Sequence, residues 1–213
     1  MTYRILVMAK APIPGTVKTR LMLPPEVAAG LQEALIQDTA AKARSLAPTT
    51  VAGAPPDRSD LLRRLLPEDV DLIAQSPGDL GDRMLAAART LFDASSDPLL
   101  LLGTDAPTLP PETIEGAASA LASHDISIIP SPDGGYVLLG LRRPVEAVFH
   151  GVDWSTEAVF RQTLLGAEGA GLSVCEGEPW YDVDAPGDLA RLGEELGAYP
   201  ERAPRTAGFL RGL

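Results

Sequence analysis

Short apolar runs alternate with segments of helical periodicity along most of this chain. Apolar residues at three- and four-residue spacing indicate amphipathic helices, and short apolar runs bounded by Gly or Pro indicate buried strands. The runs expected to form strands are residues 5–9, 50–52, 70–74, 99–102, 126–129, 136–141 and 172–175. The segments expected to form helices are residues 26–45, the stretch from Leu61 to Leu66, the stretch after Gly81, the one from Ile114 to Leu121, the one from Val159 to Leu164, and one that starts near Pro186.

This alternation predicts an α/β fold of three layers, α/β/α, with a mostly parallel sheet covered by helices on both faces. Leu99–Leu102 lies between Pro98 and Gly103 and is apolar throughout, which is typical of a central strand buried on both faces. The turn Asp133-Gly134-Gly135 leads into the run 136–141 and predicts an antiparallel element late in the sheet. We expect one domain over residues 1–199, and residues 200–213, which lack periodicity, to be a C-terminal tail.

The composition excludes several classes of protein. With 213 residues, 45% hydrophobic and 22% charged, the chain can bury the core of one domain. It contains no apolar run long enough for a membrane span and starts directly with a strand, so we expect a cytoplasmic protein without a membrane partner. The net charge of −11 argues against nucleic-acid binding, and the one cysteine, Cys175, excludes an intramolecular disulfide.

A cationic loop follows the first expected strand. Lys10, Lys18 and Arg20 lie in one stretch that is bent by Pro and by Gly15, although the chain as a whole is acidic. In α/β sheets ligands bind beyond the carboxyl ends of the strands, where this loop would lie. It matches neither the P-loop nor the Gly-x-Gly-x-x-Gly pattern. Either it is a solvated connection, or it binds a polyanion such as a nucleoside triphosphate.

Two acidic residues follow other apolar segments. Asp105 comes directly after Leu99–Leu102, and Asp184 lies just before the last expected helix. Each has a purely structural alternative, a turn for Asp105 and a helix N-cap for Asp184. If both face one site they could hold Mg²⁺ or Mn²⁺, because magnesium commonly takes one or two carboxylates together with substrate phosphates. Asp182 and Asp184 would point to opposite sides of an extended segment, and we favour Asp184 as the ligand.

The remaining candidates lie on turns and at helix starts. The turn Asp133–Tyr136 could be a simple hairpin, or its Gly pair could permit close approach to a ligand. Ser155, between Trp154 and Thr156, could be an N-cap, or the amides there could hold an acceptor. Arg83 opens a helix and could be a surface residue or a site residue.

Six motifs in this order resemble a known family. They are Lys10-x-Pro-x-Pro-Gly-x-x-Lys18-Thr-Arg20-Leu21, Gly78-x-Leu-Gly-x-Arg83-Met84, Gly103-x-Asp105-x-Pro107, Asp133-Gly-Gly-Tyr136, Trp154-Ser-Thr156 and Asp182-Val-Asp184-x-Pro186. The series resembles a bacterial family often labelled glycosyltransferase or radical-SAM/selenodomain-associated transferase. That family has the GT-A-like nucleotide-diphospho-sugar transferase fold and is related to the 2-phospholactate and molybdenum-cofactor guanylyltransferases.

The resemblance implies a role for each motif. It implies catalytic roles for Lys18, Arg20 and Asp105. It also implies that Asp105 and Asp184 bind a divalent metal, Mg²⁺ or Mn²⁺. The residues implied in nucleotide binding are Lys10, Gly15, Lys18, Arg20, Arg83 and Asp105, and those implied in acceptor binding are Asp133, Gly134, Gly135, Tyr136, Trp154, Ser155 and Thr156. The chain has Ala185-Pro-Gly187-Asp188 where the family usually has Thr-Pro-Glu-Asp, which removes a helix-capping hydroxyl.

Two activities and one alternative follow. The first is metal-dependent transfer of a nucleotidyl group from an NTP to a small phosphorylated acceptor, with release of pyrophosphate. The second is glycosyl transfer from a nucleotide-sugar, with Asp133 as a base. The absence of a second acid beside Asp105 and the three cations of the first loop favour the first activity. A non-catalytic nucleotide-binding protein remains the alternative, because fold alone does not establish activity.

Overall fold

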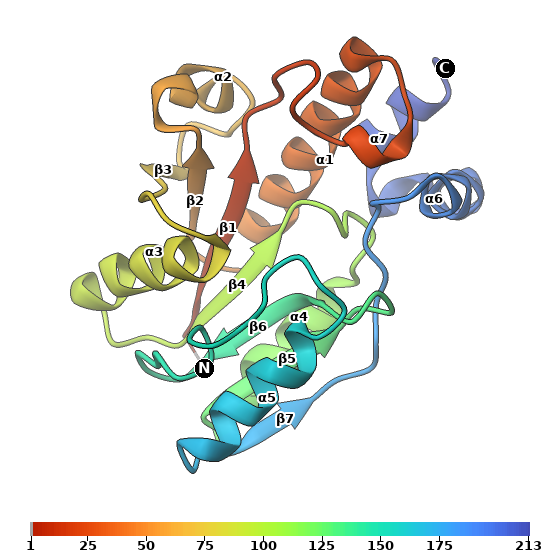
Figure 1. The fold of residues 1–213 in the computed structure, drawn as a ribbon. Coiled ribbons are helices and arrows are strands. Elements are labelled where there is room, and N and C mark those ends of the chain that lie inside the picture. The colour runs from red at the N-terminus through yellow and green to blue at the C-terminus, as the bar shows by residue number, and fades with distance from the viewer. Residues whose placement is uncertain (1) are drawn as a thin grey trace.

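A seven-stranded sheet runs through the part of the chain that the computed structural model describes, residues 2–213 (Figure 1). Its order is β3-β2-β1-β4-β6-β5-β7. The strands are β1 (Arg4–Lys10), β2 (Thr49–Ala54), β3 (Asp71–Ala74), β4 (Leu99–Gly103), β5 (Ile126–Pro130), β6 (Tyr136–Leu141) and β7 (Val174–Glu176). Strand β6 pairs antiparallel with β4 and β5, and the other pairs are parallel. The expected mostly parallel sheet with a late antiparallel element is confirmed.

Helices cover both faces of this sheet. Apolar side chains of α1 (Pro25–Leu46), α2 (Ser59–Arg63) and α4 (Pro111–Ala120) pack on one face. Those of α3 (Leu80–Ala94) and α5 (Val159–Gly169) pack on the other. Between these layers Leu99–Leu102 of β4 is buried, as expected of a central strand. The three-layer α/β/α architecture is therefore confirmed.

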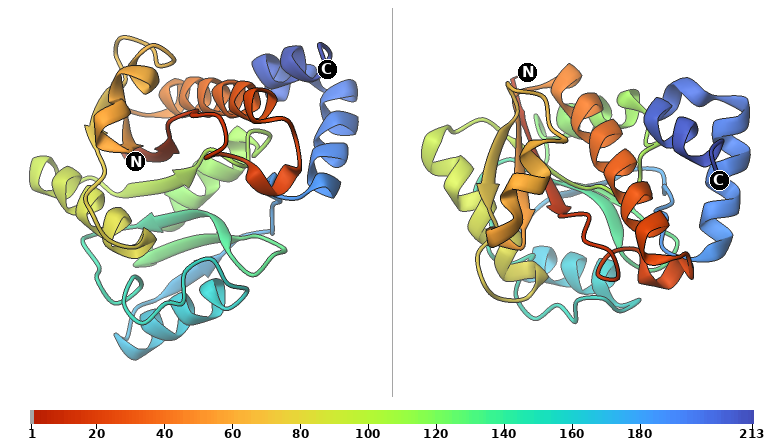
Figure 2. Two further views of the ribbon diagram at one scale, coloured as in Figure 1. Left: turned by 45° about the horizontal axis from the view of Figure 1, so that its top comes forward. Right: turned by 90° about the horizontal axis from the view of Figure 1, so that it is seen from above.

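The C-terminal segment is helical. After α6 (Pro186–Ala198) and the short 3₁₀ helix η3 (Pro200–Arg202), α7 (Pro204–Leu210) lies beside α1, as both views of Figure 2 show. Gly30 of α1 permits this approach, because a Cβ atom there would lie 2.7 Å from Cε2 of Phe209. The buried Asp38 carboxylate accepts hydrogen bonds from the amide and the hydroxyl of Thr206, each at 2.8 Å. The sequence predicted a tail here and no helix, because α7 is too short to show periodicity and is ordered by tertiary contacts.

The sheet brings two loops to one edge. In the parallel pair β1–β4, Met8 lies opposite Gly103, so Lys10 and Gly103 end their strands close together. The segment after β1, which includes the 3₁₀ helix η1 (Thr19–Leu21), therefore lies beside the segment that starts at Thr104. Within residues 2–213 no helix is both long and apolar enough to cross a membrane.

Candidate functional site

The loop between β1 and α1 has an unusual backbone. Gly15, Lys18 and Met22 have positive φ angles of 76°, 50° and 57°. Gly adopts this conformation freely, whereas for Lys and Met it is sparsely populated and persists where the surrounding contacts hold it. The ammonium of Lys10 donates to the carbonyl of Thr16 at 2.7 Å and closes the loop on itself. This backbone turns the Lys18 side chain inward.

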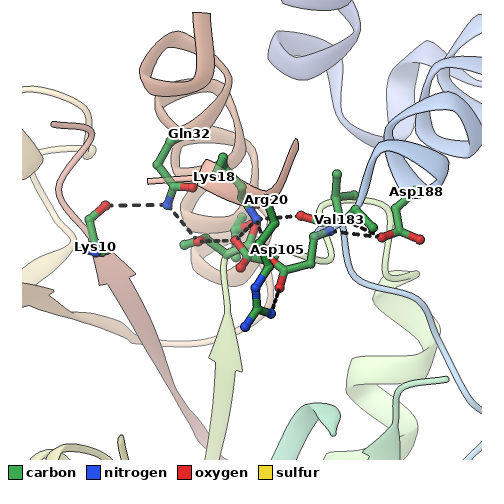
Figure 3. Close-up of polar contacts among 11 residues, drawn as sticks. Lys10, Lys18, Arg20, Gln32, Asp105, Val183 and Asp188 are labelled. Atoms are coloured by element: carbon green, nitrogen blue, oxygen red, sulfur yellow. Dashed lines mark hydrogen bonds and ion pairs between the residues drawn. The ribbon is translucent and has the colours of Figure 1, made fainter. Parts of the chain in front are cut away.

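Lys18 is the centre of the site. Its side chain is only 3% exposed, and its Nζ lies 2.8 Å from Oδ1 of Asp105 and 3.9 Å from Oδ1 of Asp184. It also donates to the carbonyl of Val183 at 2.7 Å (Figure 3). One ammonium thus joins three segments that are far apart in the sequence. The solvated-loop alternative does not hold for Lys18, because its charge is buried against charged partners.

Asp105 is held by hydrogen bonds at the end of β4. The hydroxyl of Thr104 donates to Oδ1 of Asp105 at 3.1 Å, and Nε2 of the buried Gln32 lies 3.2 Å from the same hydroxyl oxygen. The carbonyl of Asp105 accepts from the amide of Val183 at 2.8 Å. The carboxylate itself stays 41% exposed. It can therefore contact a ligand while its backbone stays fixed.

Asp184 does not cap α6. The carboxylate of Asp188 accepts from the amides of Asp184 and Ala185, at 3.2 and 2.7 Å, and so caps the helix from inside its first turn. This compensates for the missing hydroxyl at position 185. The carboxylate of Asp184 is free to form an ion pair with Nη1 of Arg20 at 3.0 Å. Arg20 is 70% exposed, so its guanidinium can move toward a ligand.

Asp182 lies near the carboxylates of Asp105, Asp133 and Asp184. Burial, followed by the nearby charge of Asp133, raises the pKa of Asp182 to about 6, with smaller contributions from Asp105 and Asp184. Four carboxylates therefore share one region. Asp184 shares the Lys18 ammonium with Asp105, and its role as the metal ligand in place of Asp182 stays a prediction.

The donor chemistry at Lys18 fits a hard divalent cation. Asp105 and Asp184 present two exposed carboxylates to one cationic group, and Mg²⁺ is often held by one or two carboxylates plus substrate phosphates. Among residues 2–213 no group of three or more His, Cys, Asp or Glu side chains is arranged to hold a metal ion by itself. An ion at these two carboxylates would take its remaining ligands from water or from substrate oxygens.

A cavity of about 470 Å³ opens beside Asp184. Most acceptor residues expected from the sequence line it, namely Asp133, Gly135, Tyr136, Trp154, Ser155 and Thr156. Arg20 and Asp184 also line it, so the ion-paired cluster and the cavity are continuous. Apolar side chains from β1, α3 and β4 form much of the remaining wall. The structure thus brings the two halves of the expected site together.

The two loops that carry the acceptor residues expected from the sequence (residues 133–136 and 154–157, hereafter the acceptor loops) touch at Gly134. With φ at +89°, Gly134 approaches the next loop so closely that a Cβ atom would lie 2.2 Å from the carbonyl oxygen of Glu157. Oδ1 of Asp133 accepts from the Ser131 hydroxyl and, at 3.0 Å, from the amide of Gly135. These contacts fix the turn as a wall of the cavity. The same turn connects the antiparallel strands β5 and β6, so it is a hairpin turn, as one alternative held, and it also lines the cavity.

Ser155 has no capping role. The N-cap of α5 is Ala158, and no side chain caps this helix. Ser155 has φ at 66° and is exposed at the cavity. The N-cap alternative for Ser155 was therefore wrong, because three residues separate it from the first residue of the helix proper.

Arg83 lies apart from the cavity lining. Its Nη1 donates to Oε1 of Gln75 at 3.2 Å, and Nε2 of this buried Gln75 donates to the carbonyls of Ala9 and Ala52 at 3.3 and 2.8 Å. Arg83 is thus connected to the carboxyl ends of β1 and β2. A nucleotide contact of Arg83 stays a prediction.

Part of the cavity wall consists of residues that no sequence motif predicted. Met8, Leu80 and Met84 line the cavity, although their pattern only predicted a strand and a helix face. Glu157 also lines it and carried no motif of its own. Apolar side chains give the same periodic signal in a core and in a cavity, so only the assembled fold separates the two.

Comparisons with known proteins place the chain in a family. Residues 35–156, more than half of the chain, match the model of a family described as "Uncharacterized protein conserved in bacteria (DUF2064)". A solved structure from Desulfovibrio desulfuricans G20, provisionally named a nucleotide-diphospho-sugar transferase, is 32% identical. The alignment covers 100% of this chain and 95% of that one, with a TM-score of 0.90. No curated protein matches.

More distant structures share the fold. A CMP:2-keto-3-deoxy-manno-octonic acid synthetase complexed with CTP has a TM-score of 0.62 at 13% identity, and the alignment covers 93% of this chain and 100% of that one. A nucleotidyl transferase from Methanothermobacter has a TM-score of 0.62 at 16% identity, with 93% and 99% covered. At such identities the likeness shows the nucleotide-diphospho-sugar transferase fold alone. The family match and the 32% identical relative together show that this chain belongs to the bacterial DUF2064 family.

Proposed function

We propose that this protein is a nucleotide-utilising transferase that moves a nucleotidyl group from an NTP to an acceptor and releases pyrophosphate. The relative from D. desulfuricans is provisionally named a transferase of nucleotide-diphospho-sugars. Two more distant structures of the same fold carry the names of a CMP:2-keto-3-deoxy-manno-octonic acid synthetase complexed with CTP and of a nucleotidyl transferase. These names support a nucleotide substrate.

The observation that carries the proposal is the convergence of opposite charges beside the cavity. Lys18 and Arg20 from the first loop meet Asp105 and Asp184 within 3.9 Å, at the carboxyl edge of β1 and β4. Ligands of α/β sheets bind outside this edge. Cations beside carboxylates that could hold a metal ion suit a substrate made of consecutive phosphates.

The chain's own residues would position the phosphates and stabilise the leaving group. Arg20 is exposed and can turn from Asp184 to the departing pyrophosphate, whose negative charge increases as its bond to the α-phosphorus breaks. The buried Lys18 holds Asp105 and Asp184 at one position. A divalent ion bound at these two carboxylates would supply Lewis-acid stabilisation of phosphate charge. The cavity adjoins this point and has room for an acceptor.

One observation favours glycosyl transfer as a second candidate. Lys18 is buried and engaged by Asp105, so only the two exposed cations Lys10 and Arg20, each held by one polar contact, can turn to a triphosphate. A nucleotide-sugar presents two phosphates and requires less positive charge than a triphosphate. The cavity would then hold the sugar and the acceptor.

A product assay separates the two activities. The purified protein is incubated with each of the four NTPs or with a panel of nucleotide-sugars, in MgCl₂ and a mixture of small acceptors. Pyrophosphate from an NTP, lost in Asp105→Asn and kept in the exposed control Asp93→Asn, is the expected result. Release of a nucleoside diphosphate from a nucleotide-sugar, without pyrophosphate from any NTP, would refute nucleotidyl transfer and support glycosyl transfer.

A further inference from the structure

The charge of the large cavity does not suit a phosphorylated acceptor. Three acidic residues line it, Asp133, Glu157 and Asp184, against Arg20 as the one cation of the described lining. Arg20 is already paired with Asp184 at 3.0 Å. A phosphate monoester, which carries nearly two negative charges at neutral pH, would face the carboxylates of Asp133 and Glu157 without a cation of its own.

The two acidic loops lie together at one end of this cavity. The contact between Gly134 and the Glu157 backbone brings Asp133 and Glu157 to the same side. Oδ1 of Asp133 is engaged by Ser131 and Gly135, whereas Oδ2 makes no hydrogen bond among the described residues. Asp133 is exposed at the cavity, so its Oδ2 is open to solvent and to a substrate group that donates a hydrogen bond.

The rest of the wall is apolar and adaptable. Met8 and Met84 offer flexible thioether side chains, and Trp154 offers an indole ring. The indole lies against α3 at Gly81, where a Cβ atom would come within 2.5 Å of Nε1 of Trp154. An aromatic ring beside methionines binds an apolar body, and an indole face also attracts a cationic group.

We infer that the acceptor is a non-phosphorylated molecule with an apolar face, whose nucleophile is a hydroxyl group directed at Asp133. This inference rests on the proposed nucleotidyl transfer and changes the acceptor that the sequence led us to expect. An acceptor phosphate is already ionised and needs no base, whereas a hydroxyl must lose a proton as it attacks, which the free oxygen of Asp133 can accept.

Nucleotidyl transfer to a hydroxyl group breaks two bonds and forms two. The acceptor O–H bond breaks and its proton passes to Oδ2 of Asp133. The acceptor oxygen forms a bond to the α-phosphorus of the NTP. The bond from that phosphorus to the bridging oxygen breaks, and the electron pair leaves on pyrophosphate. The product is a nucleoside monophosphate joined to the acceptor by a phosphodiester bond.

Three probes with one apolar body test the charge preference. Binding of 2-phenylethanol, 2-phenylethylamine and 2-phenylethyl phosphate to the full chain is measured by isothermal titration calorimetry without nucleotide. We expect the alcohol and the amine to bind at least about tenfold more tightly than the phosphate ester, because of the facing carboxylates. Equal or tighter binding of the phosphate ester, or no binding of any probe, would overturn the inference.

A charge reversal locates the effect. Glu157→Lys is expected to tighten binding of 2-phenylethyl phosphate by about tenfold or more and to leave the alcohol unchanged. Glu168→Lys, on an exposed position of α5 away from the cavity lining, is the matched control and should change neither. Both positions are exposed, and circular dichroism checks that each variant folds. Equal effects of the two substitutions would refute the role of the cavity.

Product analysis keeps this inference separate from the proposed function. Pyrophosphate release that depends on the phosphate ester, but not on the alcohol, would support nucleotidyl transfer and overturn the inference. Selective binding of the alcohol and the amine, with no nucleotide consumed, would support the acceptor class and refute nucleotidyl transfer.

Discussion

Replacement of Lys18 by Met tests the centre of the site. The substitution removes the ammonium but keeps an unbranched side chain, and it leaves the positive-φ backbone equally strained, because neither residue is Gly. Asp105 and Asp184 then face each other without their shared cation, and the carbonyl of Val183 loses its donor. The variant should therefore be less stable and should respond differently to divalent ions.

The magnitude follows from burial. Removal of one partner from a fully buried ion pair costs about 3–5 kcal/mol, whereas an exposed pair contributes about 1 kcal/mol or less. Lys18 is 3% exposed, but Asp105 and Asp184 are 41% and 40% exposed and regain water once the ammonium is gone. We therefore expect a loss of about 2 kcal/mol in the free energy of unfolding, or a melting temperature lower by about 4–8 °C for a chain of this length.

Urea unfolding and thermal melting measure the change, with Lys10→Met as the matched control. Lys10 is exposed and its ammonium donates only to the Thr16 carbonyl, so its replacement should cost less than about 0.5 kcal/mol. Mg²⁺ should raise the melting temperature of Lys18→Met more than that of the unchanged protein, because ammonium and ion compete for the same carboxylates. Equal losses of unfolding free energy in the two variants, or equal shifts of melting temperature with Mg²⁺ in Lys18→Met and the unchanged protein, would show that Lys18 does not hold Asp105 and Asp184.

Two further substitutions test residues near the site: Lys42, whose ammonium donates to the carbonyl of Leu109, and Gly134. Burial lowers the pKa of Lys42 to about 8, so between pH 8 and the ordinary value of 10.5 the unfolded chain binds more protons than the folded one. The free energy of unfolding of the unchanged protein, measured with urea relative to that of Lys42→Met, should therefore rise by at most about 3 kcal/mol from pH 7 to pH 10. A difference between the two proteins that does not change with pH would contradict the pKa shift. Gly134→Ala should cost about 2 kcal/mol or more, because its φ is +89° and its Cβ would clash with Glu157, whereas Gly116→Ala in α4, with open space around it, should be neutral or stabilising. Equal stability of the two alanine variants would mean that the acceptor loops do not need this contact.

Much of the fold follows from local patterns. The four leucines 99–102 predicted a strand buried on both faces, and the pattern of Val27, Leu31 and Leu35 predicted the helix that the structure gives as α1. These predictions succeed because a strand covered on both faces needs apolar side chains at every position. A helix that packs on the sheet needs them once per turn. Helix α7 escaped prediction, since its seven residues depend on Asp38 and on contacts with α1.

The candidate site was likewise predictable only in part. The sequence by itself determined which chemical groups follow the strands, namely the cations of the first loop, Asp105 after β4 and the acidic pair before α6. Only the tertiary structure decided that the Lys18 ammonium is buried between Asp105 and Asp184 rather than free in solution. It also decided that Met8, Met84 and Glu157 line a cavity. The physical reason is that strand order and register bring distant segments together, and no local pattern of residues encodes which side chains then meet.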